Sequence, residues 1–309
     1  MSAQPSAPLR RTRPWRITAA VAVLIGLAGY LVVQYVTGGP GAPQCTVRAE
    51  GDAKPYELSP EQAANAATIS AVASSRGLSE RAVTIALATA MQESGLRNID
   101  FGDRDSVGLF QQRPSQDWGT VKQIMDPVYS AGEFYQHLAK VPGYSRLPLT
   151  VAAQKVQRSG YPQAYAKHEA NAARLTGALT GRDQDAMTCT ESRPVDGQAG
   201  GAAKVRERLV REFGSEVLPR TGGSGGRTAG GGSGVTIPVR QSGPVAADDG
   251  GRRGWELAIW AMAHSAELRI EQISYAGRTW AADDAGKGWQ RKPAGSAVAA
   301  HHVRIITAQ

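Results

Sequence analysis

The sequence predicts a mainly α-helical protein, in which a helical domain follows a transmembrane helix and a small α+β domain lies at the C-terminus. Three observations lead to this class: an apolar run, a series of helix start and stop signals, and a glycine-rich segment before strand-like patterns. We expect a basic tail, a membrane anchor, a linker, a helical domain and an accessory domain, over residues 1–16, 17–36, 37–57, 58–190 and 191–309.

Residues 17–36 form about 20 almost uninterrupted apolar residues, enough for a helix to cross the hydrocarbon core of a bilayer. Arginines and no acidic residue precede this run, so the positive-inside rule places the N-terminus in the cytoplasm and the bulk of the chain outside. A cleaved secretory signal is the alternative, although its apolar region would be shorter and no Ala-x-Ala site follows before Gly38. We expect a single-pass protein of the cell membrane.

Composition agrees with an exported protein. The 309 residues carry a formal net charge of +8, which suits a protein held against acidic cell-wall polymers or anionic lipids. The same charge would suit nucleic acid, but no basic stripe interleaved with aromatic residues supports that partner. Cys45 and Cys189 bracket the helical domain, and outside the cell we expect them to form one disulfide; two free thiols are the alternative.

Capping signals predict the helices of the first domain. Residues 59–62, Ser-Pro-Glu-Gln, supply an N-cap, a proline at the first helical position and a capping-box glutamine, and this helix should end near Gly77. A second helix should run from Glu80 to about Ser94, where Gly95 supplies the stop signal. Further helices are expected at residues 127–138, 151–159 and 162–179.

Glu93 is the candidate catalytic residue. By the helical period it shares its stripe with Thr89 and otherwise with alanine and isoleucine side chains. An ionised carboxylate on a buried stripe is costly, so it must pair, stay near water at a cleft floor, or keep its proton through a raised pKa. A protonated glutamate at neutral pH is a general acid. The alternative is a helix-end glutamate that points to solvent.

Residues 90–94, Ala-Met-Gln-Glu-Ser, are followed after a loop by Ser-Val-Gly-Leu-Phe-Gln at 106–111 and Gln-Arg-Pro at 112–114. This arrangement resembles the soluble-lytic-transglycosylase type of the lysozyme superfamily, in its secreted actinobacterial form, over roughly residues 58–179. The resemblance implies a lysozyme-like helical fold. It also implies that Glu93 is the only essential carboxylate, which protonates the glycosidic oxygen between N-acetylmuramic acid and N-acetylglucosamine in peptidoglycan.

The resemblance also implies residues that bind the substrate. The family's Gly-Leu-Met-Gln motif corresponds to residues 108–111, which places the Gln111 amide near the N-acetyl group or the developing oxocarbenium. A later family motif should fall near residues 156–162, where Gln157 would supply an amide and Tyr161 or Tyr165 an aromatic face. Trp118 is a candidate platform for the apolar face of a sugar, or else an ordinary half-buried tryptophan. The predicted substrate-binding residues are Ser106, Gln111, Gln112, Trp118, Gln157 and Tyr161.

One carboxylate can suffice because peptidoglycan itself offers an N-acetyl carbonyl and a C6 hydroxyl. In transglycosylation Glu93 would donate its proton to the leaving oxygen and then accept the C6 hydroxyl proton, which leaves a 1,6-anhydromuramyl end. Hydrolysis would need a positioned water, which Asp103 and Asp105 could hold; the favoured interpretation of these two is a turn with solvated charges. The sequence leaves the product open, and we expect no metal or other cofactor.

The chain changes character beyond Cys189. Residues 222–234 are mostly glycine, a composition typical of a flexible linker. We expect helices at 202–213 and 255–268 and strands at 235–239, 272–275 and 303–307. The second half of this small domain faintly resembles the C-terminal half of the zinc domains of the D-Ala-D-Ala-carboxypeptidase type in the segments 261–264, 275–280, 288–289 and 301–304.

The metal signature of that second family is damaged in this chain. Its Asp-His-Val-His run reads His301-His302-Val303-Arg304 here, and an arginine offers no lone pair to zinc. We expect a non-catalytic domain that binds the wall, with His264 as a core histidine on an apolar helix stripe.

The sequence therefore predicts a membrane-anchored, outward-facing enzyme that cleaves peptidoglycan glycan strands. The alternative is a non-catalytic peptidoglycan-binding or scaffold module. A role within a cell-wall or secretion machine is a third hypothesis, on which the sequence is silent.

Overall fold

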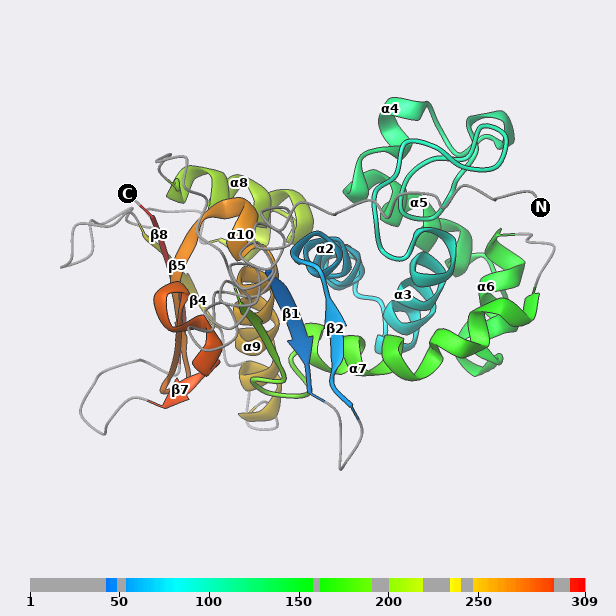
Figure 1. Cartoon of the computed structure of the whole chain (residues 1–309). Helices are drawn as coiled ribbons and strands as arrows, with labels where there is room; N and C mark the ends of the chain where they lie inside the picture. The colour runs from blue at the N-terminus through cyan, green and yellow to red at the C-terminus, as the bar shows by residue number, and fades with distance from the viewer. Residues whose placement is uncertain are drawn as a thin grey trace, which may run out of the picture. The chain divides into compact units, whose positions relative to one another are not determined.

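The computed structural model describes residues 43–48, 54–157, 162–190, 200–218, 234–239, 247–291 and 301–308 (Figure 1). Pro43–Gln309 form one compact unit. The predicted basic tail and the predicted membrane anchor lie outside the described residues. Within the described ranges, no helix is both long and apolar enough to cross a membrane.

The predicted fold class, mainly α behind a transmembrane helix, is wrong. Helices account for about 56% of the described residues, and strands for about 17% in two antiparallel sheets, so the fold is mixed α and β. The sequence analysis missed one of these sheets completely. Its strands are three or four residues long, and so few positions cannot display the alternation of apolar and polar residues that identifies a strand.

The first half of the protein is defined here as the described residues up to Thr190. Two adjacent helices form its centre: α2 (Pro60–Ser75) and α3 (Glu80–Ser94). The predicted capping box of α2 is confirmed, since the Gln62 N–H donates to Ser59 Oγ (3.2 Å) and the Ser59 N–H donates to Gln62 Oε1 (2.8 Å). The predicted end of α3 is also confirmed, because Gly95 adopts φ 64°, the left-handed conformation that a glycine accepts readily.

Shorter helices surround this pair, with α7 against α3 and α5 against α2 (Figure 1). They are η1 (Pro114–Gln116), α4 (Val121–Ile124), α5 (Pro127–Ala139), η2 (Tyr144–Arg146), α6 (Leu149–Gln157), η3 (Pro162–His168) and α7 (Glu169–Leu179). The single helix predicted over residues 162–179 is thus a 3₁₀ segment followed by an α-helix.

A three-stranded antiparallel sheet joins the two ends of this helical part. It consists of β1 (Gln44–Val47), β2 (Tyr56–Leu58) and β3 (Met187–Thr190), in the order β2-β1-β3. Cys45 lies directly opposite Cys189 in the β1–β3 register, and the two form a disulfide. The predicted disulfide is confirmed.

The second half, defined as the described residues from Gly200 onward, contains a five-stranded antiparallel sheet in the order β4-β8-β5-β6-β7. Its elements are α8 (Ala202–Phe213), η4 (Ser215–Val217), β4 (Gly234–Pro238), α9 (Ala247–Ala263), α10 (Ser265–Leu268), β5 (Ile270–Tyr275), β6 (Arg278–Ala281), η5 (Ala282–Lys287), β7 (Gln290–Arg291) and β8 (His302–Thr307). Helix α9 packs on β5 and β8 on one side and on α2 and α7 on the other, so it lies between the sheet and the helical part (Figure 1).

The two halves share a buried core. Trp280 Nε1 of β6 donates to the Cys189 carbonyl (3.2 Å), and Trp289 Nε1 donates to the Met187 carbonyl (2.9 Å), so two indoles of the second half hold β3 of the first. Described residues on both sides of the predicted boundary at 190 therefore pack together.

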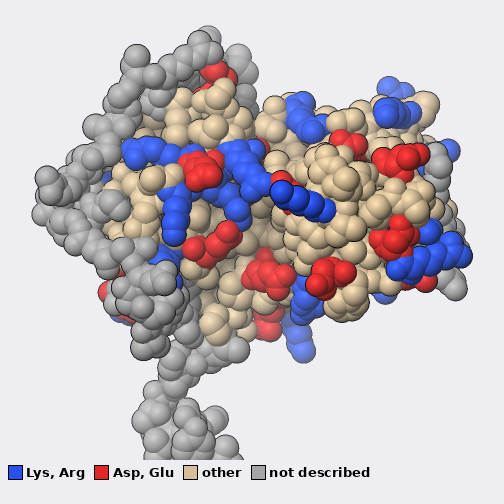
Figure 2. Space-filling view, turned by 90° about the horizontal axis from the view of Figure 1, so that it is seen from above, with Lys and Arg blue, Asp and Glu red and all other residues tan. Residues whose placement is uncertain are grey.

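Lys and Arg side chains gather on the face that carries α8, with acidic side chains among them (Figure 2). Arg208 pairs with Glu267 (2.7 Å), and Arg211 pairs with Asp126. These pairs offset part of the positive charge on this face.

Candidate active site

Glu93 lies on the last turn of α3, half-buried, where the helix meets the loop that carries the Gly-Leu-Phe-Gln motif. The Tyr165 hydroxyl, from the fully buried side chain of η3, donates a 2.6 Å hydrogen bond to Glu93 Oε1. The next residue, Ser94, donates from Oγ to the Leu109 carbonyl (2.8 Å). The end of α3 is thus fastened both to η3 and to the motif loop.

Burial raises the pKa of Glu93 above its ordinary value, while hydrogen bonds from Tyr165 and Gln157 lower it in part, and the net direction is upward. Gln157 Nε2 also donates to the Phe110 carbonyl (2.7 Å), which links α6 to the motif loop beside the carboxyl group. A carboxyl group that keeps its proton closer to neutral pH has the property that a general acid requires.

The motif loop is held rigidly by its own backbone. Gly108 adopts φ +79°, and a Cβ there would lie 2.9 Å from the Ile124 carbonyl oxygen, so only glycine fits. The Gly108 N–H donates to the Ile99 carbonyl (2.7 Å), and Val107 and Gln112 pair as a β-bridge. These backbone contacts therefore fix the shape of the loop.

Two predicted substrate-binding residues of this loop are directed into the protein. Ser106 is 7% exposed and Gln112 is 2% exposed, with Gln112 Nε2 donating to the Ser130 carbonyl (3.1 Å). Gln111 differs, because its side chain is half-buried and its Nε2 lies 3.3 Å from the carbonyl oxygens of Phe101 and Gly108. Among these three side chains, Gln111 is the one with surface left for a ligand.

Trp118 is 8% exposed, and its ring centroid lies 4.1 Å from that of His137 on α5. This packing leaves little of the indole for a sugar to cover. Gln157 lies beside Glu93, through the hydrogen bond already described. The predicted contact Tyr161 lies outside the described residues.

The two acidic residues of the preceding loop shape a turn. Asp105 Oδ1 accepts from Arg113 Nε (2.7 Å) and Oδ2 accepts from the Ser115 N–H (2.8 Å), and these contacts hold the pKa of Asp105 well below its ordinary value. The side chain of Asp103 is exposed, and its carbonyl accepts from the Ser106 N–H (3.1 Å). Asp103 therefore fits the interpretation of a turn with a solvated charge, whereas Asp105 lies in an ion pair with Arg113.

Tyr165, which the sequence analysis gave as the alternative to Tyr161, is the tyrosine that contacts Glu93. Tyr165 and His168 lie three residues apart, one turn of the 3₁₀ segment, so they occupy the same side of η3. His168 Nε2 lies 3.1 Å from Gln92 Oε1, so the pair meets two consecutive residues of α3. The i, i+3 spacing of these side chains is the sequence signal for this contact, although it requires knowing that the segment is 3₁₀.

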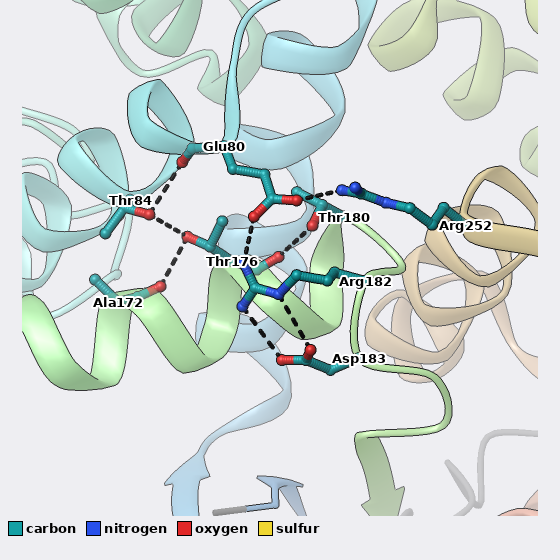
Figure 3. A network of polar contacts seen from close by, with 8 residues as sticks. All are labelled: Glu80, Thr84, Ala172, Thr176, Thr180, Arg182, Asp183 and Arg252. Carbon is teal, nitrogen blue, oxygen red and sulfur yellow. Dashed lines mark hydrogen bonds and ion pairs between the residues drawn. The ribbon is translucent and has the colours of Figure 1, made fainter. Parts of the chain in front are cut away.

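The opposite end of α3 is fixed by a polar network (Figure 3). Glu80 accepts from Arg182 of the loop after α7 and from Arg252 of α9, and Thr84 Oγ1 lies 2.9 Å from Thr176 Oγ1. A cavity of about 430 Å³ lies beside this network. It is distant from the candidate site, because a helix of this length places Glu80 and Glu93 about 20 Å apart.

The core histidine of the second half behaves as predicted. His264 is 0% exposed, with Nε2 3.5 Å from Glu212 Oε2 and Nδ1 3.5 Å from Glu267 Oε2. Across the residues that the structure describes, no group of three or more His, Cys, Asp or Glu side chains is arranged to hold a metal ion.

Comparison with known proteins gives a match to the C-terminal part of the chain. No curated protein matches the chain. Residues 195–303 match the family described as VldE, C-terminal domain, a stretch that runs from α8 into β8 and does not include Glu93. The chain is thus similar to that family over its second half, and the candidate site rests on the geometry around Glu93.

Proposed function

We propose that this protein is an enzyme that cleaves the glycan strands of peptidoglycan at the bond between N-acetylmuramic acid and N-acetylglucosamine. The observation that carries the proposal is the half-buried Glu93 carboxyl group with a raised pKa and a 2.6 Å hydrogen bond from Tyr165. Its position beside a rigid Gly-Leu-Phe-Gln loop, with Gln157 in reach, supports the same reaction class.

The arrangement supports a reaction with one acid/base group. Tyr165 donates to Oε1, so the proton of a neutral Glu93 resides on Oε2, from which it passes to the glycosidic oxygen as the C1–O bond breaks. The carboxylate that remains keeps the hydrogen bond from Tyr165 and accepts the C6 hydroxyl proton as the C6 oxygen bonds to C1. The product is a 1,6-anhydromuramyl end; a water in place of the C6 hydroxyl would give a reducing end.

The proposal places this reaction on the outer face of the cell membrane, with the apolar segment 17–36 as the export signal and anchor. The Cys45–Cys189 disulfide supports an oxidising location, because such bonds persist outside the cytoplasm. The peptidoglycan substrate lies in the same compartment.

The test is mass spectrometry of muropeptides released from purified peptidoglycan by the full chain, by Glu93→Gln and by Glu207→Gln. The last is a matched control, since Glu207 is an exposed glutamate of α8. We expect anhydromuramyl ends from the unmutated protein and the control, and none from Glu93→Gln. Reducing ends with the same dependence would identify a hydrolase.

Two results would contradict the proposal. Unchanged release by Glu93→Gln would exclude Glu93 as the acid. No release by any of the three proteins, with each still pelleting on peptidoglycan, would favour the non-catalytic binding module.

A further inference from the structure

Phe101 is 70% exposed, and it is the one aromatic side chain among the large exposed hydrophobic residues of the described ranges. An exposed apolar residue is common on a protein surface and by itself carries no meaning. Its place in the fold decides whether it has a function.

The backbone around Phe101 holds the ring in this exposed position. Asn98 Nδ2 donates to the Met125 carbonyl (2.7 Å), and the Ile99 carbonyl accepts from the Gly108 N–H (2.7 Å). The Phe101 carbonyl itself accepts from Gln111 Nε2 (3.3 Å). The loop is therefore fixed just before the ring and at the Phe101 carbonyl, and the exposure is a property of the folded chain.

A short series of contacts connects Phe101 to the candidate acid. Phe101 contacts Gln111 of the motif loop, and the carbonyl of the adjacent Phe110 accepts from Gln157. Gln157 in turn hydrogen-bonds Glu93. A Cβ at Gly102 would lie 1.9 Å from Gln111 Oε1, which shows how closely the Phe101 loop packs on the motif loop.

We infer that Phe101 is the aromatic platform on which a sugar ring of the glycan strand stacks, next to the Gln111 amide. This inference rests on the proposed function, since it names the residue that binds the strand at the same site. Sugar rings have apolar C–H faces that an aromatic ring covers, while their hydroxyl groups need polar partners or water. Asp100, Asp103 and Arg104 of the same loop are exposed and can serve those hydroxyl groups.

The geometry favours Phe101 over Trp118 for this role. Trp118 was a candidate platform from the sequence, but its 8% exposure and its contact with His137 leave little of its ring open. Phe101 offers an open ring on a loop that contacts Gln111 directly. A stacking interaction covers one face of the ring, for which we expect about a tenfold change in affinity.

Binding is measured first, in a Glu93→Gln background so that no turnover interferes, by calorimetry with soluble uncrosslinked glycan strands. Phe101→Ala should weaken binding about tenfold. Phe101→Trp should restore it, because another aromatic ring also stacks. Val210→Ala, at an exposed apolar position of α8 (38% exposed), is the control that should bind normally. Circular dichroism and melting temperature confirm that each variant is folded.

Turnover by the otherwise unmutated protein is measured next. Phe101→Ala should raise KM about tenfold and leave kcat within about twofold, because a platform holds the strand without touching the bond that breaks. Normal binding by Phe101→Ala, or no rescue by Phe101→Trp, would overturn the inference.

The two measurements separate this inference from the proposed function. If the unmutated protein releases muropeptides through Glu93 and Phe101→Ala binds normally, the platform fails while the function stands. If no protein releases muropeptides and Phe101→Ala still loses its affinity for the strand, the platform stands on a binding module.

Discussion

The hydrogen bond from Tyr165 is one of the contacts that determine the pKa of Glu93. This bond lowers the pKa of Glu93 against the larger rise that burial causes, so its removal should raise the pKa further. In Tyr165→Phe we therefore expect the alkaline fall in kcat/KM to move to higher pH, with a lower maximal rate because the carboxylate is a less stable product of proton transfer. A pH–rate profile measures this, with Tyr56→Phe as the control. A shift to lower pH would contradict the assignment.

Glu93 should also reduce the stability of the fold at neutral pH. A carboxyl group whose pKa is raised by folding stabilises the native state below its ordinary pKa of 4.5, and this contribution is lost as the pH rises through the folded pKa. Glu93→Gln removes the buried charge, so at pH 7 it should be at least as stable as the unmutated protein, with the difference shrinking toward pH 4. Urea unfolding at the two pH values measures this. A large loss of stability at pH 7 would show that the ionised carboxylate is structural.

Local signals in the sequence predicted the position of Glu93 at the end of a helix, but not the side chains that surround it. The glycine stop at Gly95 and the apolar stripe of α3 are properties of neighbouring residues, so the sequence contains them. The burial of Trp118 depends on His137, and the choice between Tyr161 and Tyr165 depends on where η3 begins. The first depends on a contact between residues distant in the chain, and the second on the exact start of an element. Local residue patterns predict neither.

At the scale of the elements, a disulfide bond links two strands of the three-stranded sheet, β1 and β3. The Cys45–Cys189 disulfide closes a loop with a sequence separation of 144. In the chain-entropy account, its removal in the Cys45→Ser, Cys189→Ser double variant should cost about 5 kcal/mol of unfolding free energy. Urea unfolding measures this cost, and reduction of the unmutated protein should reproduce it. A loss below about 1 kcal/mol would mean that strand pairing alone closes the loop.

Elements differed in how well the sequence specified them. The start of α2 was predictable because Ser59 and Gln62 contact each other within a single turn. The strands β1 and β3 were not, because each pairs with a partner more than a hundred residues away and carries only four residues. The two cysteines indicated that the ends meet, but not that they meet as a sheet.

At the scale of the whole molecule, Gly181 lies where α7 meets α9. A Cβ at Gly181, which has φ +70°, would lie 2.0 Å from the Arg252 carbonyl oxygen, so Gly181→Ala must displace backbone of the second half. We expect a loss of about 3 kcal/mol or more. Gly143→Ala is the control, since Gly143 has φ +65° with open space around it, and it should lose only about 1 kcal/mol. If thermal unfolding shows equal losses of stability for the two variants, the two halves do not pack closely at Gly181.

The buried contact between His264 and Glu212 should make the stability of the whole molecule depend on pH. Burial alone would lower the pKa of His264, but Glu212 and Glu267 raise it overall; burial alone would raise the pKa of Glu212, but His264, Trp260 and Arg208 lower it overall. The stability from Glu212 is lost as pH falls below its ordinary 4.5, and that from His264 as pH rises above its ordinary 6.5.

Unfolding free energy should therefore be highest between about pH 4.5 and 6.5 and should fall above that range. His264→Gln leaves Glu212 buried without one of its cationic partners, so it should lose about 3 to 5 kcal/mol near pH 6 and should lack the further fall at alkaline pH. Urea unfolding from pH 4 to 9 measures both effects. A flat profile for the unmutated protein would exclude a charged His264.

The sequence did not predict how the two halves pack together. Trp280 and Trp289 bond to carbonyl groups of β3, and Thr68 of α2 contacts Glu212 of α8 (3.0 Å). No local pattern marks these residues as partners, since their positions are remote in the chain. The sequence could indicate helices and strands on each side of residue 190, but not that they share one core.

The disulfide also determines how the protein carries mechanical load. Tension applied along the chain crosses directly from Cys45 to Cys189 through the sulfur–sulfur bond, so the peptide between them is shielded. Glu93, Gln157 and Tyr165 all lie in the shielded stretch. In single-molecule stretching, the contour length gained on unfolding should omit this stretch, roughly 500 Å of extended chain, until a reductant cuts the bond. A pull applied at the two ends of the chain would therefore bypass the peptide that carries these three residues.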